Sequence, residues 1–123
     1  MDKIDILRKY PFCLVVTEGE DGRPVKCQRG HEGRQARSVD LHHGIIGKDK
    51  RFRKWLNVEI NYQPACAYCN RERVADTYFN RMYWLEFQCR AKGRRLVRAW
   101  LDSVPKKKQL GVDWKDADTR LRR

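Results

Sequence analysis

The stretch PACAYCN, residues 64 to 70, places the strongest constraint on how this chain can fold. Its two cysteines, Cys66 and Cys69, form C-x-x-C, a spacing that lets two thiolates bind one tetrahedral zinc ion. A pair of small apolar residues at a helix start and a redox-active dithiol are the alternatives. One C-x-x-C supplies only half of a four-ligand structural site, so the zinc interpretation requires a second pair of ligands elsewhere in the sequence.

The best candidate for the second pair lies in CQRGH, where Cys27 and His31 are four positions apart. Together with the C-x-x-C pair they would make a zinc site of three cysteines and one histidine. Cys13 is the reserve ligand, because the apolar run FCLVV around it favours burial in the core. Cys89 falls on the apolar face of an expected helix and is most simply a core residue.

The length and charge of the chain limit the kinds of partner. At 123 residues the chain is expected to form one domain, residues 1–123, that is small enough to gain from a metal staple. It carries 28 Lys and Arg residues against 16 Asp and Glu residues, a formal net charge of +12, which favours a polyanionic partner. We expect nucleic acid and no membrane, because no apolar run approaches the roughly 20 residues that span a bilayer.

The amino-terminal stretch MDKIDILRKYPF is charged and poor in apolar residues. It has no signal-peptide pattern. We therefore expect a cytoplasmic, intracellular protein whose five cysteines are reduced, bound to metal or buried.

The order of the expected elements indicates an α+β fold. Residues 3 to 10 predict a short helix, FCLVVT and VKC predict two short strands, and residues 37 to 46 predict another extended segment. After the C-x-x-C pair, apolar residues recur every three or four positions, which predicts one long amphipathic helix, and Gly93 separates it from a second helix. The first apolar face comprises Val74, Tyr78, Met82, Leu85 and Cys89, and the second comprises Leu96, Val97, Trp100, Leu101 and Val104.

Two adjacent histidines, His42 and His43, end the extended segment VDLHHGIIGK and are followed at once by a glycine. Ordinary polar residues at a strand end are the simplest interpretation of such a pair. The chain continues, however, with Asn61 and then, nine positions later, with Asn70, which directly follows the C-x-x-C pair at an expected helix start. A helix cap is the alternative role for Asn70.

The order DLHH and then INYQPACAYCN resembles the HNH, or ββα-metal, nucleases over about residues 27 to 80. It is most similar to their H-N-N branch, which includes the phage endonuclease VII resolvases and in which the third motif residue is an asparagine. The resemblance implies a small ββα-metal (His-Me finger) domain whose β-hairpin and helix hold one catalytic metal ion. A zinc knuckle and a basic helical part at about residues 90–123 would complete it.

Two positions depart from the family pattern. The first zinc knuckle is not C-x-x-C, which leaves Cys27 and His31 open as ligands. Val74 stands where many HNH enzymes place another histidine, which excludes the three-histidine zinc site of the bacteriocin nucleases and agrees with the H-N-N branch.

The resemblance implies a catalytic role for three residues. His43 would be the general base that takes a proton from water. His42 would be a ligand of the catalytic ion, and Asn70 would supply the second protein ligand through its amide oxygen. Such a donor set suits Mg2+ or Mn2+.

Two further residues would support this site. Asn61 would bond to the backbone of the loop and keep the general base in place, with Asn57 as the alternative occupant of that position. Asp40, two residues before His42 on the same face of a strand, would be an additional ligand or a partner of the ligands, unless it faces solvent.

Two basic segments are candidates for DNA contact, because Lys and Arg side chains bind phosphates without reading bases. The segment KDKRFRK lies in the expected loop between the histidines and Asn61, and residues 89 to 108 carry eight basic residues against one acidic residue. Solvated helix or loop faces are the alternative. The candidates are Lys48, Lys50, Arg51, Arg53, Lys54, Arg94, Arg95, Arg98, Lys106, Lys107 and Lys108.

The sequence therefore predicts a zinc-stapled DNA endonuclease that hydrolyses phosphodiester bonds in duplex or branched DNA with one divalent cation. A non-catalytic zinc-binding module for nucleic acid is the alternative. One active site per chain would favour a homodimer if both strands are cut. A phage origin is suggested by the family only.

Overall fold

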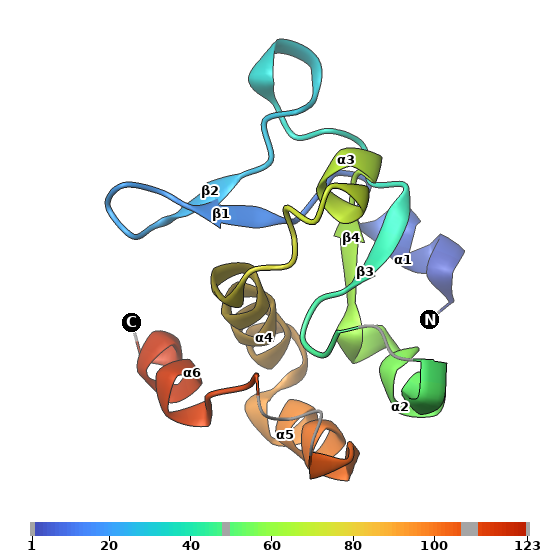
Figure 1. The fold of residues 1–123 in the computed structure, drawn as a ribbon, viewed down its shortest axis with the longest axis vertical. Coiled ribbons are helices and arrows are strands. Elements are labelled where there is room, and N and C mark those ends of the chain that lie inside the picture. Colours follow the sequence, from blue (N-terminus) through green and yellow to red (C-terminus); the bar gives the residue numbers. More distant parts are fainter. Residues whose placement is uncertain (1, 48–49, 107–110, 123) are drawn as a thin grey trace.

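The computed structural model describes residues 2–47, 50–106 and 111–122, which combine helices with two small antiparallel sheets (Figure 1). The expected α+β class is therefore confirmed. Each sheet consists of two strands. No helix within these ranges is both long enough and apolar enough to cross a membrane.

The first sheet is a short hairpin near the amino terminus. Helix α1 (Lys3–Lys9) precedes it, and strands β1 (Val16–Glu18) and β2 (Pro24–Lys26) pair in antiparallel register. The strand expected from FCLVVT is shorter than its apolar run, because Phe12 forms only an isolated bridge with Arg37. Between Phe12 and β1, Cys13 and Val15 are buried and Leu14 is partly buried.

The second sheet carries the histidine pair. Strands β3 (Asp40–His43) and β4 (Tyr62–Ala65) are antiparallel, and His42 lies opposite Gln63. Helix α3 (Ala67–Arg71) begins almost directly after β4. The two strands and the helix therefore follow one another in the order β, β, α, with the histidines at the end of the first strand.

The connection between β3 and β4 was expected to be a loop, and it contains short helices in its described part. Two 3-10 helices, η2 (Lys50–Phe52) and η3 (Glu59–Asn61), flank the single turn α2 (Arg53–Leu56). Phe52 and Leu56 are buried in the main core. The two apolar anchors explain why this basic segment folds back onto the protein.

The carboxy-terminal half is helical, with α4 (Tyr78–Lys92) lying between the sheets and helices α5 (Arg94–Ser103) and α6 (Trp114–Leu121) (Figure 1). Gly93 separates α4 from α5 as expected, and its φ of 94° is a conformation that favours glycine. The main core joins these helices to the segment after β3. Its buried residues are Ile45, Ile46, Phe52, Leu56, Met82, Trp84, Leu85, Cys89, Val97, Leu101, Val104 and Ala117.

The prediction of one long helix after the C-x-x-C pair is wrong, because two helices, α3 and α4, occupy that stretch. Helix α3 ends at Arg71, and Arg73 adopts a positive φ of 59°, which breaks the helical path. Thr77 then starts α4, since its hydroxyl accepts a hydrogen bond from the backbone N–H of Asn80. Of the expected apolar face, Met82, Leu85 and Cys89 are buried, whereas Tyr78 is exposed and Val74 lies before the helix.

The glycine that follows the histidines has a packing role. A Cβ atom at Gly44 would overlap Cδ1 of Trp84 and would also crowd Gln63. Gly44 also donates its backbone N–H to the carbonyl of Asn61. The end of β3 can therefore lie directly on α4 only because this position has no side chain.

Candidate functional site

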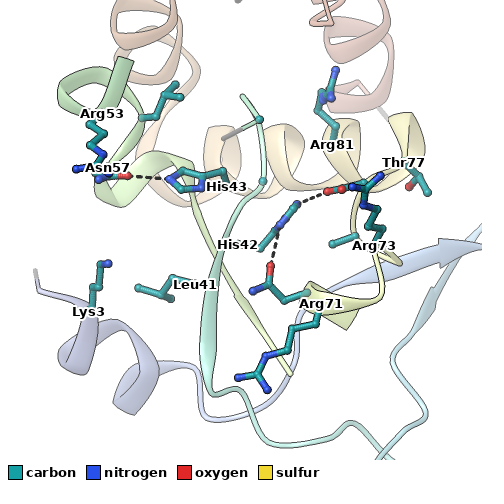
Figure 2. Close-up of a pocket in the computed structure, with 16 residues that line it drawn as sticks. Lys3, Leu41, His42, His43, Arg53, Asn57, Arg71, Arg73, Thr77 and Arg81 are labelled. Carbon is teal, nitrogen blue, oxygen red and sulfur yellow. Dashed lines mark hydrogen bonds and ion pairs between the residues drawn. The ribbon is translucent and has the colours of Figure 1, made fainter. Parts of the chain in front are cut away.

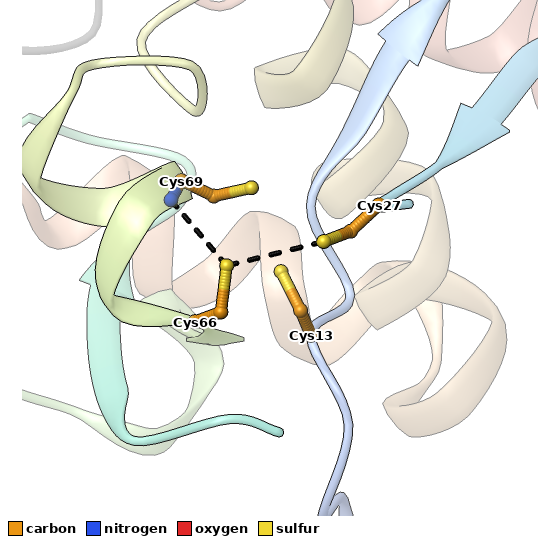
Figure 3. Close-up of side chains that lie close together, drawn as sticks. All are labelled: Cys13, Cys27, Cys66 and Cys69. Carbon is orange, nitrogen blue, oxygen red and sulfur yellow. Dashed lines mark hydrogen bonds between the residues drawn. The ribbon is translucent and has the colours of Figure 1, made fainter. Parts of the chain in front are cut away.

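Four cysteines gather where the first hairpin meets helix α3 (Figure 3). Cys13 precedes β1, Cys27 follows β2, Cys66 caps α3 and Cys69 lies within it. All four are buried, and their sulfur atoms lie within 4.8 Å of one another. The Sγ atoms of Cys27 and Cys66 are 3.9 Å apart, close to the ~3.8 Å between two sulfurs that bind one tetrahedral zinc ion at about 2.3 Å. This cysteine tetrad could hold a metal ion such as zinc.

The fourth member of the tetrad is Cys13, and the prediction of His31 as a ligand is wrong. The His31 side chain is 91% exposed in the 3-10 helix η1 (His31–Gly33) and pairs with the exposed carboxylate of Glu32. The reason is the hairpin, because antiparallel strands bring the segment before β1, which contains Cys13, and the segment after β2, which begins with Cys27, to the same end of the sheet. The reserve ligand Cys13 is thereby placed beside Cys27.

The surroundings of Cys13, Cys27 and Cys69 shift the pKa values of these three thiols. Burial raises the pKa of the Cys13 thiol to about 12, and it also raises the pKa of Cys69. Burial acts in the same direction on Cys27, but hydrogen bonds from the backbone of Ala36 and Arg29 and with the side chains of Cys69 and Cys66 together outweigh it and lower the pKa of that thiol. A cation bound here must displace thiol protons, so the affinity of the tetrad for metal is expected to fall in acid.

The histidine pair of β3 lines an open pocket of about 830 Å³ (Figure 2). Five basic side chains and one carboxylate, that of Asp76, line the described part of this pocket. A pocket lined by more positively charged than negatively charged side chains favours an anionic ligand. The basic residues are Lys3, Arg53, Arg71, Arg73 and Arg81.

His42 contacts a different oxygen through each ring nitrogen. Its Nδ1 lies 3.2 Å from Oδ1 of Asn70, and its Nε2 lies 3.5 Å from Oδ1 of Asp76. Burial lowers the pKa of His42 below its ordinary value, against a smaller opposite effect of Asp76. The imidazole is therefore neutral at neutral pH and keeps a lone pair. One imidazole nitrogen with amide and carboxylate oxygens fits a hard divalent cation such as Mg2+ or Mn2+.

Asp40 lies behind Asn70. Its Oδ2 accepts a hydrogen bond of 3.3 Å from Nδ2 of Asn70 and lies 3.7 Å from Nε of Arg71. Asp40 does not line the pocket. Of the two roles considered for it, the contacts fit a partner of Asn70.

Asp76 was missed by the sequence analysis. It lies in the turn between α3 and α4, where one continuous helix was expected. The available signal was the pair Asp76 and Thr77, since a threonine in a polar stretch before an apolar pattern is typical of a helix start.

His43 is held by an asparagine for which another role was considered. Nε2 of His43 lies 2.8 Å from Oδ1 of Asn57, at the end of α2. When the amide oxygen accepts this hydrogen bond, Nε2 carries the ring proton and Nδ1 keeps the lone pair. The ring also lies against Tyr62, with centroids 5.8 Å apart. Asn57 therefore contacts His43 directly, whereas Asn61 bonds to the loop backbone.

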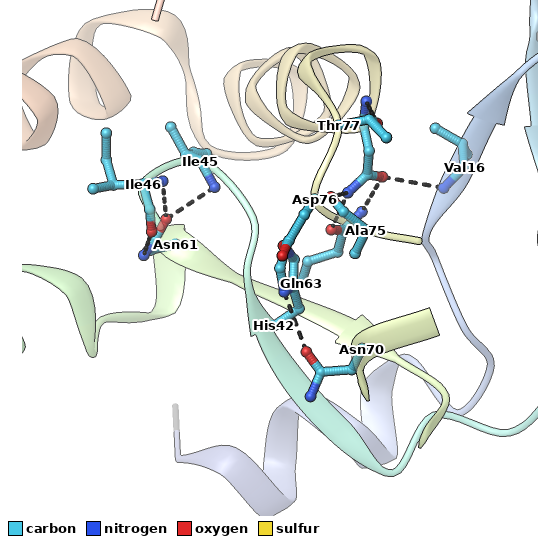
Figure 4. A network of polar contacts seen from close by, with 11 residues as sticks. Val16, His42, Ile45, Ile46, Asn61, Gln63, Asn70, Ala75, Asp76 and Thr77 are labelled. Carbon is cyan, nitrogen blue, oxygen red and sulfur yellow. Dashed lines mark hydrogen bonds and ion pairs between the residues drawn. The ribbon is translucent and has the colours of Figure 1, made fainter. Parts of the chain in front are cut away.

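Asn61 is fully buried, and in the described ranges its side chain forms hydrogen bonds with backbone groups (Figure 4). Its Oδ1 accepts from the N–H groups of Ile45 and Ile46 at 3.0 and 2.9 Å. Its Nδ2 donates to the carbonyls of Ile46 and Leu56, both at 3.1 Å. These four bonds join the segment after His43 to the end of α2, which is the kind of loop contact that the HNH resemblance implies.

We predict that Asn61→Ala lowers the free energy of unfolding by at least about 3 kcal/mol. The substitution leaves two buried N–H groups and two carbonyls without their partner, and each such group costs about 1–3 kcal/mol. Asn57→Ala is the matched control, because Asn57 is exposed and its loss should change stability by less than about 0.5 kcal/mol. Urea unfolding of both variants measures the difference, and equal stabilities would contradict the structural role of Asn61.

A second buried amide pair fixes the turn that carries Asp76. Gln63 and Asn80 donate to each other's side-chain oxygen at 2.9 and 2.8 Å, and Asn80 also donates to the carbonyl of Ala75 (Figure 4). Oδ1 of Asn80 accepts from the N–H of Val16 in β1. Strand β4, helix α4 and the first hairpin are thus locked to the backbone next to Asp76.

The basic residues at the pocket differ from most of those expected to contact DNA. Arg53 is the described member of KDKRFRK that lines the pocket. Arg94 binds both carboxylate oxygens of Asp118 and lies over Trp114, as does Arg98, so these two arginines serve contacts within the protein. Arg95 and Lys106 are exposed and do not line the pocket. The predictions for Lys48, Lys107 and Lys108 fall outside the described residues.

The remaining basic candidates lie on the segment after β3. Arg51 and Lys54 lie over the rings of Phe52 and Trp55, and neither lines the pocket. Lys50 begins the 3-10 helix η2.

Comparisons of the chain with protein-family models, with curated proteins and with solved structures found no match.

Proposed function

We propose that this protein is a metal-dependent endonuclease of the HNH type that hydrolyses phosphodiester bonds in DNA. The observation that supports it most is the pairing of His42 and His43 in one basic pocket. His42 has an oxygen atom near each ring nitrogen, and these oxygens could bind a cation together with the ring. In His43, the hydrogen bond of Nε2 to Asn57 leaves the lone pair of Nδ1 to accept a proton. The β, β, α order of β3, β4 and α3 agrees with the fold that the sequence resemblance implies.

His43 would act as the general base. With its proton on Nε2 and Asn57 accepting it, the Nδ1 lone pair is available to a water molecule that attacks the phosphorus. Asn57 then acts as a positioning residue, because it selects the tautomer and fixes the ring. The Tyr62 ring lies beside the His43 imidazole and restricts its movement.

His42 would bind the catalytic Mg2+ or Mn2+ ion, with an oxygen donor from Asn70 or Asp76 beside its ring. Such an ion, when bound, supplies positive charge to the phosphoryl oxygens and to the leaving oxygen. The neutral state of His42 keeps its lone pair ready for the ion. The Gln63–Asn80 pair holds the turn on which Asp76 lies.

The cysteine tetrad would bind a structural zinc ion. Its four buried sulfurs link the first hairpin to the start of α3, the helix that carries Asn70. The apolar cluster around it is small and contains few residues besides the cysteines. Zinc would therefore stabilise the half of the domain that a modest core cannot hold alone.

The basic residues of the pocket would bind the phosphates on either side of the scissile bond. We predict that the double variant Arg53→Ala, Arg73→Ala weakens binding to duplex DNA about equally for all sequences. It should also flatten the plot of log affinity against log salt by about 0.9 for each lost phosphate contact. Arg95→Ala is the matched control, since Arg95 is exposed away from the pocket. Fluorescence anisotropy from 50 to 200 mM salt measures both effects. An unaltered slope in the double variant would exclude these arginines from the interface.

The test of the proposed function is the nicking of supercoiled plasmid. The zinc-loaded protein should convert it to the relaxed form with Mg2+ or Mn2+ and should stop when EDTA is added. A non-catalytic zinc-binding module would shift the plasmid in a gel and leave it supercoiled. Matched linear, nicked and four-way-junction DNA would then identify the preferred substrate.

A further inference from the structure

The two ring nitrogens of His42 have unequal contacts. Nδ1 lies 3.2 Å from the amide oxygen of Asn70, which is at the long end of the usual range for an N–H···O hydrogen bond. Nε2 lies 3.5 Å from a carboxylate oxygen of Asp76, which is beyond that range. The His42 side chain is largely buried, with 12% of its surface exposed.

Asn70 determines which nitrogen carries the proton. Its amide nitrogen donates to Asp40, so its amide oxygen is the end that faces His42. An amide oxygen can only accept, and Nδ1 must therefore carry the proton of the neutral ring. The Asp40 carboxylate that accepts this hydrogen bond also lies 3.7 Å from Nε of Arg71.

The tautomer leaves a lone pair on Nε2 that faces an anion. In the neutral ring, Nε2 has no proton to give to Asp76, and a lone pair opposite a carboxylate oxygen is repulsive. A cation between them removes the repulsion. Two donors that each lie about 2.1 Å from one ion are about 3.0 Å apart at a right angle and about 3.4 Å apart at a tetrahedral angle, so 3.5 Å needs little adjustment.

We propose that the divalent cation binds between Nε2 of His42 and the carboxylate of Asp76, and that Asn70 is a positioning residue that fixes the tautomer of His42. The identity of the reaction rests on the proposed function, whereas the ion site itself does not. The backbone beside Asp76 is held by Asn80 through the carbonyl of Ala75, which presets the carboxylate. Asp76 is 53% exposed toward the pocket, so the remaining positions on the ion are open to water and to a phosphate oxygen.

The affinity of the full, zinc-loaded chain for Mn2+ alone tests the assignment, measured without DNA by the loss of the free-ion signal in electron paramagnetic resonance. Asn70→Ala should weaken binding about 10- to 100-fold, as the loss of an orienting partner does. Asp76→Ala should weaken it further, and Asp76→Asn should fall between Asp76→Ala and the unchanged protein. Glu72→Ala is the control, because Glu72 is an exposed carboxylate near α3 that does not line the pocket.

Histidine ring ¹⁵N spectra give a second measurement that does not depend on affinity. His42 should be the Nδ1–H tautomer, and Mg2+ should shift the Nε2 resonance. Unchanged Mn2+ affinity in Asp76→Ala, or a shift of Nδ1 in place of Nε2, would overturn the proposal. If Mn2+ binding depends on Asp76 but the protein does not cut DNA, the proposed nuclease function is wrong and the ion site is supported. If Asp76→Ala cleaves DNA at the unchanged rate, the ion site is wrong and the nuclease function is supported.

Discussion

Replacing Cys13 with serine is expected to release tightly bound zinc and to abolish cooperative folding of the protein. Structural zinc contributes apparent free energies of about 10–16 kcal/mol in small zinc domains, and a typical domain has only about 5–15 kcal/mol of net stability. Cys13 is the member of the tetrad that lies before β1, opposite the two cysteines of α3, and the apolar cluster around it is small. Elemental analysis of the purified protein and thermal unfolding followed by circular dichroism measure the two losses.

Two control variants test whether the effect comes from loss of a metal ligand. One replaces a buried cysteine outside the tetrad, and the other replaces His31, the ligand predicted from the sequence. Cys89→Ser changes a buried cysteine outside the tetrad, and it should keep the zinc and lose only packing energy. His31→Ala removes the exposed histidine and should keep both zinc and stability. Full zinc content in Cys13→Ser, together with its loss in His31→Ala, would restore the three-cysteine, one-histidine site.

Replacing His43 with alanine is expected to slow DNA cleavage by about 10²- to 10⁴-fold, the range for a lost general base. The side chain is partly exposed at the pocket, and within the described part of the chain its polar side-chain contact is to Asn57. Stability and zinc content should therefore change little. Affinity for DNA should also change little, because we propose that the basic residues bind the phosphates. Single-turnover cleavage at saturating protein measures the rate without a contribution from binding.

Asn57→Ala and His31→Ala are the controls for that rate. Asn57→Ala should slow cleavage less than His43→Ala, because the base remains and only its orientation is lost. His31→Ala should cleave at the unchanged rate, since His31 lies outside the pocket. A His43→Ala rate within a few-fold of the unchanged protein would remove His43 from the mechanism.

The cysteine tetrad shows how far the sequence could predict the metal site. The C-x-x-C spacing is local, so Cys66 and Cys69 could be assigned from it. The other two members of the tetrad, Cys13 and Cys27, depend on which residues a hairpin brings together, and no short spacing encodes this. Cys13 was kept only as the reserve ligand because its apolar neighbours favour burial in the core, but its buried sulfur lies within 4.8 Å of the other three.

The helices show a similar limit. Apolar periodicity identified Met82, Leu85 and Cys89 correctly as buried residues. It could not show that Arg73 adopts a positive φ and that a new helix starts at Thr77, because both depend on a few local hydrogen bonds. That break creates the turn of Asp76, so the error about one helix also hid one side of the pocket.

The histidine pocket was predictable only in its motif residues. His42, His43 and Asn70 could be singled out because the family pattern orders them along the chain, and the structure brings His42 and Asn70 into contact. The basic residues of the pocket come from α1, α2, α3, α4 and the turn before α4. The sequence analysis selected segments rich in Lys and Arg, whereas the residues of the pocket are far apart in the sequence. Some arginines of those segments pair with carboxylates or lie over aromatic rings.

The most direct test of the central claim is the chemistry of the DNA ends after incubation with Mn2+. Hydrolysis in which the 3′ oxygen leaves gives a 3′-hydroxyl and a 5′-phosphate, so a DNA ligase should reseal every nick that the zinc-loaded protein makes in a plasmid. The same preparation of His43→Ala should make about 10²- to 10⁴-fold fewer nicks in the same time. A plasmid that stays supercoiled with every divalent cation, or equal nicking by the two proteins, would contradict the account.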